Sequence, residues 1–279
     1  MTTAPTTPVT TGTLSVPGAE LYYEVRGAGS PLLLTAAPMD AASFEALANL
    51  LADDHLVVTT DPRGIGRSPV ADPDLDCTPE MRAEDASRLM RHLGIGSAAV
   101  LGSSGGAVSV LALAQSHPEQ VHTVIAHEPP LDELVEDREE LRVATEAMIA
   151  TYLSGDVRGA WVQFLATANI QLPDEVLEMM IGGDRDPQVV ADEHYQFAHM
   201  LRATTRWQPD LDTLRAIPTR VVVGIGEEST GQLCDRTSRA LATALGIEPT
   251  LFPGDHVGFL EVPEAFATRL RAVLGEGRP

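Results

Sequence analysis

The chain has 279 residues and a mass of 29.7 kDa, enough for one large domain or for one domain with an insertion. Its 44% of hydrophobic residues exclude general disorder, and the sequence has neither the glycine period of collagen nor the heptads of a coiled coil. The formal net charge of −21 argues against nucleic acids and anionic membranes as partners. All 19 basic residues are arginine, which excludes a catalytic lysine.

Cysteine usage and the chain start indicate a cytoplasmic protein. Cys77 and Cys234 lie far apart and form neither a disulfide framework nor a metal motif. The first residues lack the positive charge and apolar segment of a signal peptide, and no apolar run is long enough to span a membrane. Because the sequence also lacks HExxH, a spaced histidine cluster and a phosphate-binding glycine loop, we expect no metal and no cofactor. The oligomeric state leaves no visible signal.

In chain order, the sequence predicts a flexible tail, an edge hairpin and then alternating strands and helices. Residues 1–12 are rich in Thr and Pro and predict the tail, and two amphiphilic runs at 13–17 and 20–26 could pair as an antiparallel hairpin. Short apolar runs predict buried strands at 32–35, 56–60, 98–101, 123–126, 221–225 and 250–252. Helical patterns fall at 43–53, 79–93, 106–117, 231–245 and 263–274. This alternation predicts an α/β fold with a mostly parallel central sheet and helices on both faces.

The alternation stops between Pro130 and Ile217. Only helical patterns occur there, at 133–153, 157–169, 174–181 and 187–203. We therefore predict a core formed by residues 13–130 and 218–279, with an all-helical cap at 131–217. Such an insertion is expected over the carboxyl edge of the sheet, where open α/β sheets bind ligands.

Large side chains of the predicted cap could form an apolar wall of a binding site. Trp161 and Phe164 share one helical face and are our candidate substrate-binding residues, together with His127 at the end of a predicted strand. Helical stripes ordinarily pack inside a protein, so simple core packing is the alternative for most of these side chains. The wider set of candidates adds Met179, Met180, Tyr195 and Trp207.

The segment Gly102-Ser103-Ser104-Gly105-Gly106 carries the sharpest chemical signal. It follows the predicted strand at 98–101 and opens the predicted helix at 106–117. A nucleophile on such a tight strand-to-helix turn needs small neighbours two residues away on each side, which Gly102 and Gly106 provide around Ser104. The alternative, a flexible Gly/Ser linker, is disfavoured by the flanking apolar runs. Ser104 is therefore the candidate nucleophile.

A serine hydroxyl requires a base, and His256 is the best candidate. It lies in a glycine-flanked loop between the last predicted strand and the last helix, at the carboxyl edge of the sheet. The alternative is an exposed loop histidine. The other histidines lie at helix ends, at strand starts or in the cap, apart from His127, which could line the site.

The serine turn and the late histidine resemble those of the α/β-hydrolase fold superfamily, in its serine-nucleophile form with a helical cap. The resemblance extends from about residue 20 to 275. The segment from Asp61 to Ser68 resembles a structural loop of that family, so Arg63 and Arg67 receive no catalytic role. The family order of nucleophile, acid and histidine implies an acid between Ser104 and His256.

The family pattern also implies an oxyanion hole and a triad acid, and the chain departs from it at both. The resemblance implies the backbone N–H groups of Ala37 and Gly105 as the hole, although Ala36 stands where the family commonly has glycine. Ser229 occupies the usual position of the acid. Glu228, one position earlier, is our first choice, and Glu128 after the strand at 123–126 is the alternative.

These residues predict a serine hydrolase that cleaves a small-to-medium apolar ester or related acyl compound through an acyl-enzyme. The alternative is an α/β-hydrolase-fold protein with non-hydrolytic chemistry, such as a cyclase or lyase, or with a ligand-binding role. A perhydrolase or haloperoxidase activity would use the same triad.

Overall fold

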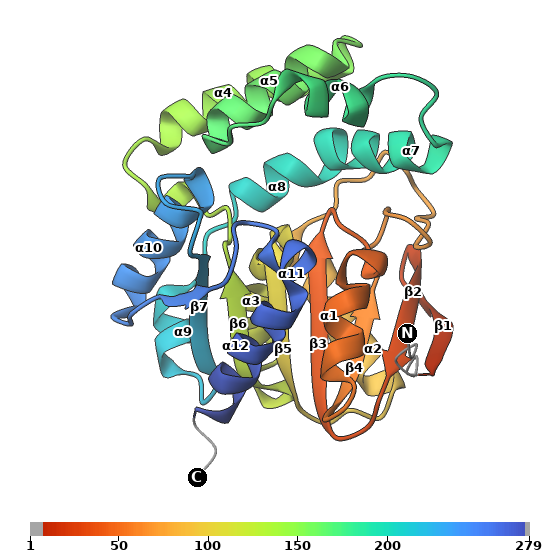
Figure 1. Ribbon diagram of the computed structural model, residues 1–279, viewed down its shortest axis with the longest axis vertical. Coiled ribbons are helices and arrows are strands. Elements are labelled where there is room, and N and C mark those ends of the chain that lie inside the picture. Colours follow the sequence, from red (N-terminus) through yellow and green to blue (C-terminus); the bar gives the residue numbers. More distant parts are fainter. Residues whose placement is uncertain (1–7, 277–279) are drawn as a thin grey trace, which may run out of the picture.

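An eight-stranded sheet forms the centre of the computed structural model, which describes residues 8–276 (Figure 1). The strand order is β1-β2-β4-β3-β5-β6-β7-β8. The strands are β1 (Val9–Val16), β2 (Ala19–Arg26), β3 (Ser30–Ala37), β4 (His55–Thr60), β5 (Ala98–Ser104), β6 (Val121–His127), β7 (Arg220–Gly226) and β8 (Thr250–Phe252). β1 and β2 pair in antiparallel fashion, β2 is antiparallel to β4, and the pairs from β4 to β8 are parallel. The mostly parallel α/β sheet is therefore confirmed.

The expected tail needs correction at its carboxyl end. Residues 9–12 belong to β1, where Val9 to Gly12 pair with Arg26 to Tyr23. The Thr-rich sequence suits a strand because β-branched side chains pack well on a pleated surface. Residues 1–7 of the predicted tail lie outside the described residues.

Helices cover both faces of the sheet. On one face lie α2 (Pro79–His92), α3 (Gly105–Ser116), α9 (Leu211–Ala216) and α10 (Leu233–Leu245); on the other lie α1 (Glu45–Leu51), α11 (Gly258–Glu261) and α12 (Pro263–Gly275) (Figure 1). Successive strand residues point to opposite faces, so Leu33 enters the first core cluster while Leu32 and Leu34 enter the second. Short 3₁₀ turns occur at η1 (Ala41–Phe44), η2 (Pro118–Gln120) and η3 (Asp132–Leu134).

Local sequence signals account for the ends of these helices. The hydroxyl of Thr78 accepts a hydrogen bond from the N–H of Met81 and Pro79 occupies the first turn, so α2 begins there. Gly246 adopts a left-handed conformation with φ 69° and ends α10.

A second layer of helices lies over the carboxyl ends of the strands. It contains α4 (Arg138–Leu153), α5 (Val157–Ala168), α6 (Asp174–Ile181), α7 (Pro187–Tyr195), a π-helical turn η4 (Gln196–Met200) and α8 (Leu201–Thr205) (Figure 1). The single helix expected at 187–203 is interrupted by this π turn. Leu214 of α9 instead packs in a core cluster, so the helices over the sheet edge end with α8. Across residues 8–276, no helix combines the length and the apolar composition that a membrane crossing requires.

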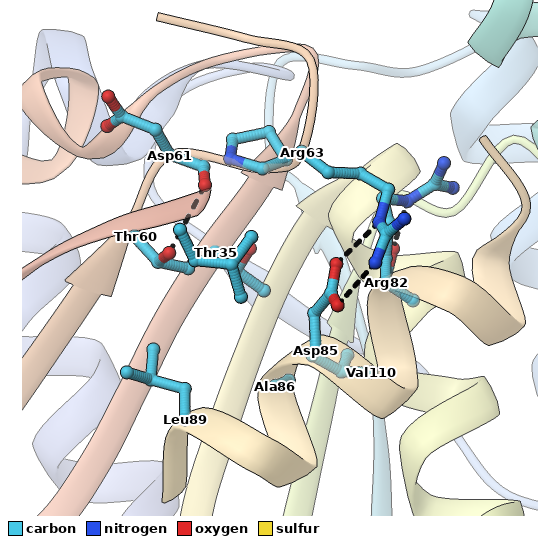
Figure 2. Close-up of a pocket in the computed structure, with 12 residues that line it drawn as sticks. Thr35, Thr60, Asp61, Arg63, Arg82, Asp85, Ala86, Leu89 and Val110 are labelled. Carbon is cyan, nitrogen blue, oxygen red and sulfur yellow. Dashed lines mark hydrogen bonds and ion pairs between the residues drawn. The ribbon is translucent and has the colours of Figure 1, made fainter. Parts of the chain in front are cut away.

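The loop after β4 is fixed by buried ion pairs. The guanidinium of Arg63 donates two hydrogen bonds of 2.6 Å to the carboxylate of Asp85 on α2, as Figure 2 shows. This pair borders a small cavity of about 30 Å³, which Arg82 and Thr35 also line. Arg67 donates to the fully buried carboxylate of Asp61. Both arginines are held by carboxylates in this loop, and neither lines the larger cavity beside Ser104.

Candidate active site

Ser104 lies on a strained turn between β5 and α3. Its φ of 55° and ψ of −126° are unusual for a residue with a side chain. A Cβ at position 102 would lie 2.2 Å from the carbonyl oxygen of Gly106, and one at position 106 would lie 2.5 Å from Cα of Ala36. The chain can therefore make this turn only with glycine on both sides, which is the physical basis of the motif.

A cavity of about 390 Å³ lies between this turn and the helices above the sheet edge. The core contributes Ser104 and His256 to its wall, and the upper helices contribute Trp161 and Phe164. The other lining side chains are mainly apolar and include Pro130, Met148, Ile170, Met180, Met200, Leu201 and Leu233. The space therefore suits a largely apolar ligand positioned against a serine hydroxyl.

Glu128 orients the imidazole of His256. Its Oε2 lies 2.6 Å from Nδ1 of His256, and its Oε1 accepts a 2.8 Å hydrogen bond from the N–H of Gly226. Glu128 follows β6 directly, has a positive φ of 53°, and is fully buried. Because both oxygens have fixed donors, the carboxylate holds the ring in one orientation.

The surroundings keep Glu128 ionised. Burial acts to raise the pKa of its carboxyl, but the hydrogen bond and positive charge of His256 outweigh burial and lower the pKa to about 2. Ser229, which stands at the usual family position of the acid, is fully buried, and its Oγ has no hydrogen-bond partner among residues 8–276.

Cys234 lies beside His256, and the sequence contained no signal for this contact. The ligand atoms of Glu128, Cys234 and His256 lie within 4.8 Å of one another. Burial acts to lower the pKa of the His256 ring, whereas the carboxylate of Glu128 raises it. Burial also raises the pKa of the Cys234 thiol, which is therefore neutral near pH 7. Glu128 is then the group that stabilises a positive charge on His256.

This trio has ligand types that could bind a metal, but its hydrogen bonds favour proton transfer. Both oxygens of Glu128 already accept hydrogen bonds, from Gly226 and from the ring of His256. A metal at this place would have to displace at least one of them. The same bonds leave Nε2 as the imidazole nitrogen that can serve a substrate.

Ser104 and His256 both lie in the wall of this cavity, as does Val257, the residue after His256. No direct Ser104–His256 hydrogen bond is present among the described residues. In enzymes without substrate this bond is often long and shortens when the substrate binds.

The predicted oxyanion donors also lie at this point. Ala37 and Gly105 both line the cavity, and Ala37 pairs with Ser104 in the register of β3 and β5. A Cβ on Gly105 would lie 2.7 Å from the carbonyl oxygen of Ala37, so the two backbones are in close contact. The N–H of Gly105 belongs to the first turn of α3, where N–H groups lack partners within the helix.

Two predicted site residues are corrected by the structure. Glu228 is exposed, and its backbone N–H donates to the carbonyl of Gly254, whereas Glu128 is the carboxylate in contact with His256. His127 is fully buried and does not belong to the cavity wall. His127 is two residues after Ile125 on β6, so both side chains lie on the same face of the sheet. The ring of His127 therefore points into the core, against Phe252 and Phe266.

The core position of His127 affects its charge. Burial lowers the pKa of its ring to about 4, so it is neutral near pH 7. Its Nδ1 lies 3.1 Å from Oγ of Ser103, the residue before Ser104. His127 therefore supports the strand below the turn.

The cap aromatics divide between the cavity and the core. Trp161 and Phe164 line the cavity, and Nε1 of Trp161 donates to Glu193. Tyr195 and Trp207 are buried in other clusters. Met180 lines the cavity, whereas Met179 is exposed.

The fold and the comparisons place this chain in a known family of hydrolases. Residues 32–165 match the family described as alpha/beta hydrolase fold, and the chain belongs to that family. It is 32% identical to an uncharacterized hydrolase, YraK, of Bacillus subtilis strain 168, over 95% of this chain and 96% of that protein. It is 27% identical to a zearalenone hydrolase of Bionectria ochroleuca, over 92% and 95% of the two chains. The structure of a thermophilic esterase from Thermogutta terrifontis matches with a TM-score of 0.66 and 21% identity, over 96% of this chain and 98% of that chain.

Proposed function

We propose that this hydrolase is a serine hydrolase that cleaves a small-to-medium, largely apolar ester or related acyl compound. The observation that carries the proposal is the 2.6 Å contact between Glu128 and His256, with His256 and Ser104 in the wall of one apolar cavity. Relatives named as hydrolases, including the zearalenone hydrolase, support hydrolysis.

In the proposed reaction, Oγ of Ser104 attacks the carbonyl carbon of the ester and His256 accepts the hydroxyl proton. Glu128 keeps Nδ1 of the ring protonated and stabilises the imidazolium. The N–H groups of Ala37 and Gly105 stabilise the oxyanion. His256 then donates its proton to the leaving alcohol, and a water molecule releases the acyl group by the same steps in reverse order.

Covalent labelling tests the nucleophile. We expect a fluorophosphonate to form an adduct on Ser104, located by peptide mass spectrometry, and Ser104→Ala to lower ester turnover roughly 10³-fold or more. Ser103→Ala is the matched control, because the neighbouring Ser103 contacts His127 inside the core. The control should keep both the label and turnover.

Unchanged ester hydrolysis in Ser104→Ala would contradict the proposal. Ligand binding that persists in Ser104→Ala, with no hydrolysis of an ester panel by the unmodified protein, would favour the ligand-binding or non-hydrolytic alternative.

A further inference from the structure

The cavity contains a buried carboxyl group that the proposed mechanism does not use. Asp132 lies in η3, directly after the segment that leaves β6, and lines the cavity together with Ser104 and His256. Its side chain is only 2% exposed, and Oδ1 has no hydrogen-bond partner among residues 8–276. Because buried polar atoms in folded proteins are almost always hydrogen-bonded, to protein or to water, a carboxyl oxygen without a protein donor beside a cavity is a candidate contact for a molecule bound there.

Among residues 8–276, no ion pair forms on the carboxyl of Asp132, although Arg236 lies near enough to act on its charge. Burial, followed by the negative charges of Glu133 and Asp137, raises the pKa of Asp132 to about 7, and Arg236 opposes the rise. Arg236, on α10, donates its hydrogen bond to Asp137 instead. The neutral thiol of Cys234, also on α10, lies on the same cavity wall.

A hydroxyl group is the partner that best fits this environment. A hydroxyl both donates and accepts hydrogen bonds, so it can pair with the carboxyl of Asp132 in either protonation state. An ammonium group could pair only with the ionised form, and its desolvation in a mainly apolar cavity opposes the attraction. The apolar lining accommodates the remainder of such a molecule.

We propose that Asp132 forms a subsite that binds a hydroxyl group on an otherwise apolar ester substrate. The inference rests on the proposed function, since it assigns a substrate class to the same cavity. Asp132 is a specificity-determining residue here and takes no part in bond breaking.

Paired substrates test the subsite. The probes are p-nitrophenyl hexanoate and a series of counterparts that carry one hydroxyl at successive carbons of the acyl chain. We expect kcat/KM of the intact protein to favour at least one hydroxylated ester over the plain ester. In Asp132→Leu this preference should fall roughly tenfold, the loss expected for one hydrogen bond to a buried acceptor. Asp132→Asn should keep part of the preference, because an amide also forms hydrogen bonds.

Thr145→Val is the control, since Thr145 is another buried polar side chain in the same wall. The hydroxyl preference should persist in this variant. An equal loss in Thr145→Val would overturn the proposal, and so would an undiminished preference in Asp132→Leu or no preference in the intact protein. A preference for the matching amino ester that grows as pH rises through about 7 would overturn it in favour of an ammonium site.

Failure of this proposal can be distinguished from failure of the proposed function. Hydrolysis of the plain ester by the intact protein and by Asp132→Leu reports on Ser104 chemistry alone. If no ester is hydrolysed, calorimetric binding of the same plain and hydroxylated esters still tests the subsite. Tighter binding of a hydroxylated ester that is lost in Asp132→Leu would support it, and equal binding would overturn it.

Discussion

At the scale of single residues, two buried carboxyl groups have opposite properties: Glu128 contacts His256, and Asp132 lies in the cavity wall. Glu128 has fixed hydrogen bonds from Gly226 and His256 and a pKa lowered to about 2, so it is ionised at neutral pH. Asp132 is similarly buried, its Oδ1 has no hydrogen-bond partner among residues 8–276, and burial raises its pKa to about 7. Similar burial thus produces a charged orienting group and a group close to neutrality, because only one of them has donors.

The orienting role predicts a large loss of activity in Glu128→Gln. The amide is nearly isosteric but cannot hold Nδ1 of His256 protonated in the same way, so we expect kcat to fall about 10⁴-fold. Steady-state kinetics on an activated ester measures it. Glu228→Gln is the matched control and should retain full activity, because Glu228 is exposed and Glu128 is the carboxylate that contacts the ring. Equal losses in the two variants would contradict our assignment of the acid.

The raised pKa of Asp132 predicts a pH-dependent gain in stability for Asp132→Asn. The folded pKa of about 7 exceeds the ordinary 3.8, so the stability from the protonated carboxyl is complete below pH 3.8 and is lost as pH rises through about 7. The variant should therefore have a higher free energy of unfolding at pH 8, by up to about 4 kcal/mol, and little advantage at pH 4.

Urea denaturation at several pH values measures this difference. Asp74→Asn, at an exposed loop residue, is the control. An advantage of Asp132→Asn that does not change with pH would contradict the prediction.

At the scale of elements, the turn between β5 and α3 depends on backbone contacts with β3. Gly106 lies against Ala36, where an added Cβ would be 2.5 Å from Cα and 2.6 Å from the carbonyl oxygen of Thr35. These are main-chain atoms of a central strand and cannot move without disturbing the sheet. The same contact brings the predicted oxyanion donors together.

Gly106→Ala should therefore destabilise the protein. We expect the free energy of unfolding to fall by about 1–3 kcal/mol from overpacking, with a parallel loss of activity. Thermal unfolding followed by circular dichroism measures the first effect. Gly96→Ala, where no heavy atom lies within 4 Å of the added Cβ, should leave the transition unchanged. A transition in Gly106→Ala as high as that of Gly96→Ala would show that the contact is not limiting.

At the scale of the whole molecule, one buried ion pair connects the loop after β4 to helix α2, which covers one face of the sheet. Arg63 and Asp85 are only 5% and 6% exposed, and the pair is bidentate (Figure 2). Burial tends to raise the pKa of Asp85, and Arg63 opposes this rise. Removal of one charge would leave the other buried without compensation.

Asp85→Asn should lower the free energy of unfolding by about 3–5 kcal/mol, as for a broken buried pair. Chemical denaturation measures this change. The control is Asp212→Asn. The carboxylate of Asp212 pairs with Arg215 but is 95% exposed, so this ion pair should contribute only about 0–1 kcal/mol. Equal effects of the two substitutions would contradict the importance of burial.

The sequence alone determined the fold class and the position of Ser104. Short apolar runs that alternate with helical patterns are typical of parallel strands covered by helices on both faces, and glycines at 102 and 106 are required by a local turn. These signals are local in the chain, so they can be read without the fold.

Only the tertiary structure decided which carboxylate contacts His256, that His127 belongs to the core, and that Asp132 and Cys234 face the cavity. Each of these facts depends on contacts between segments far apart in sequence, as between Glu128 and His256. Because side chains alternate along β6, that of His127 points into the core. The left-handed backbone at Glu128 breaks this alternation, and the Glu128 side chain points toward His256. Chain spacing does not encode such directions, because they arise from the register of the sheet and the packing of its loops.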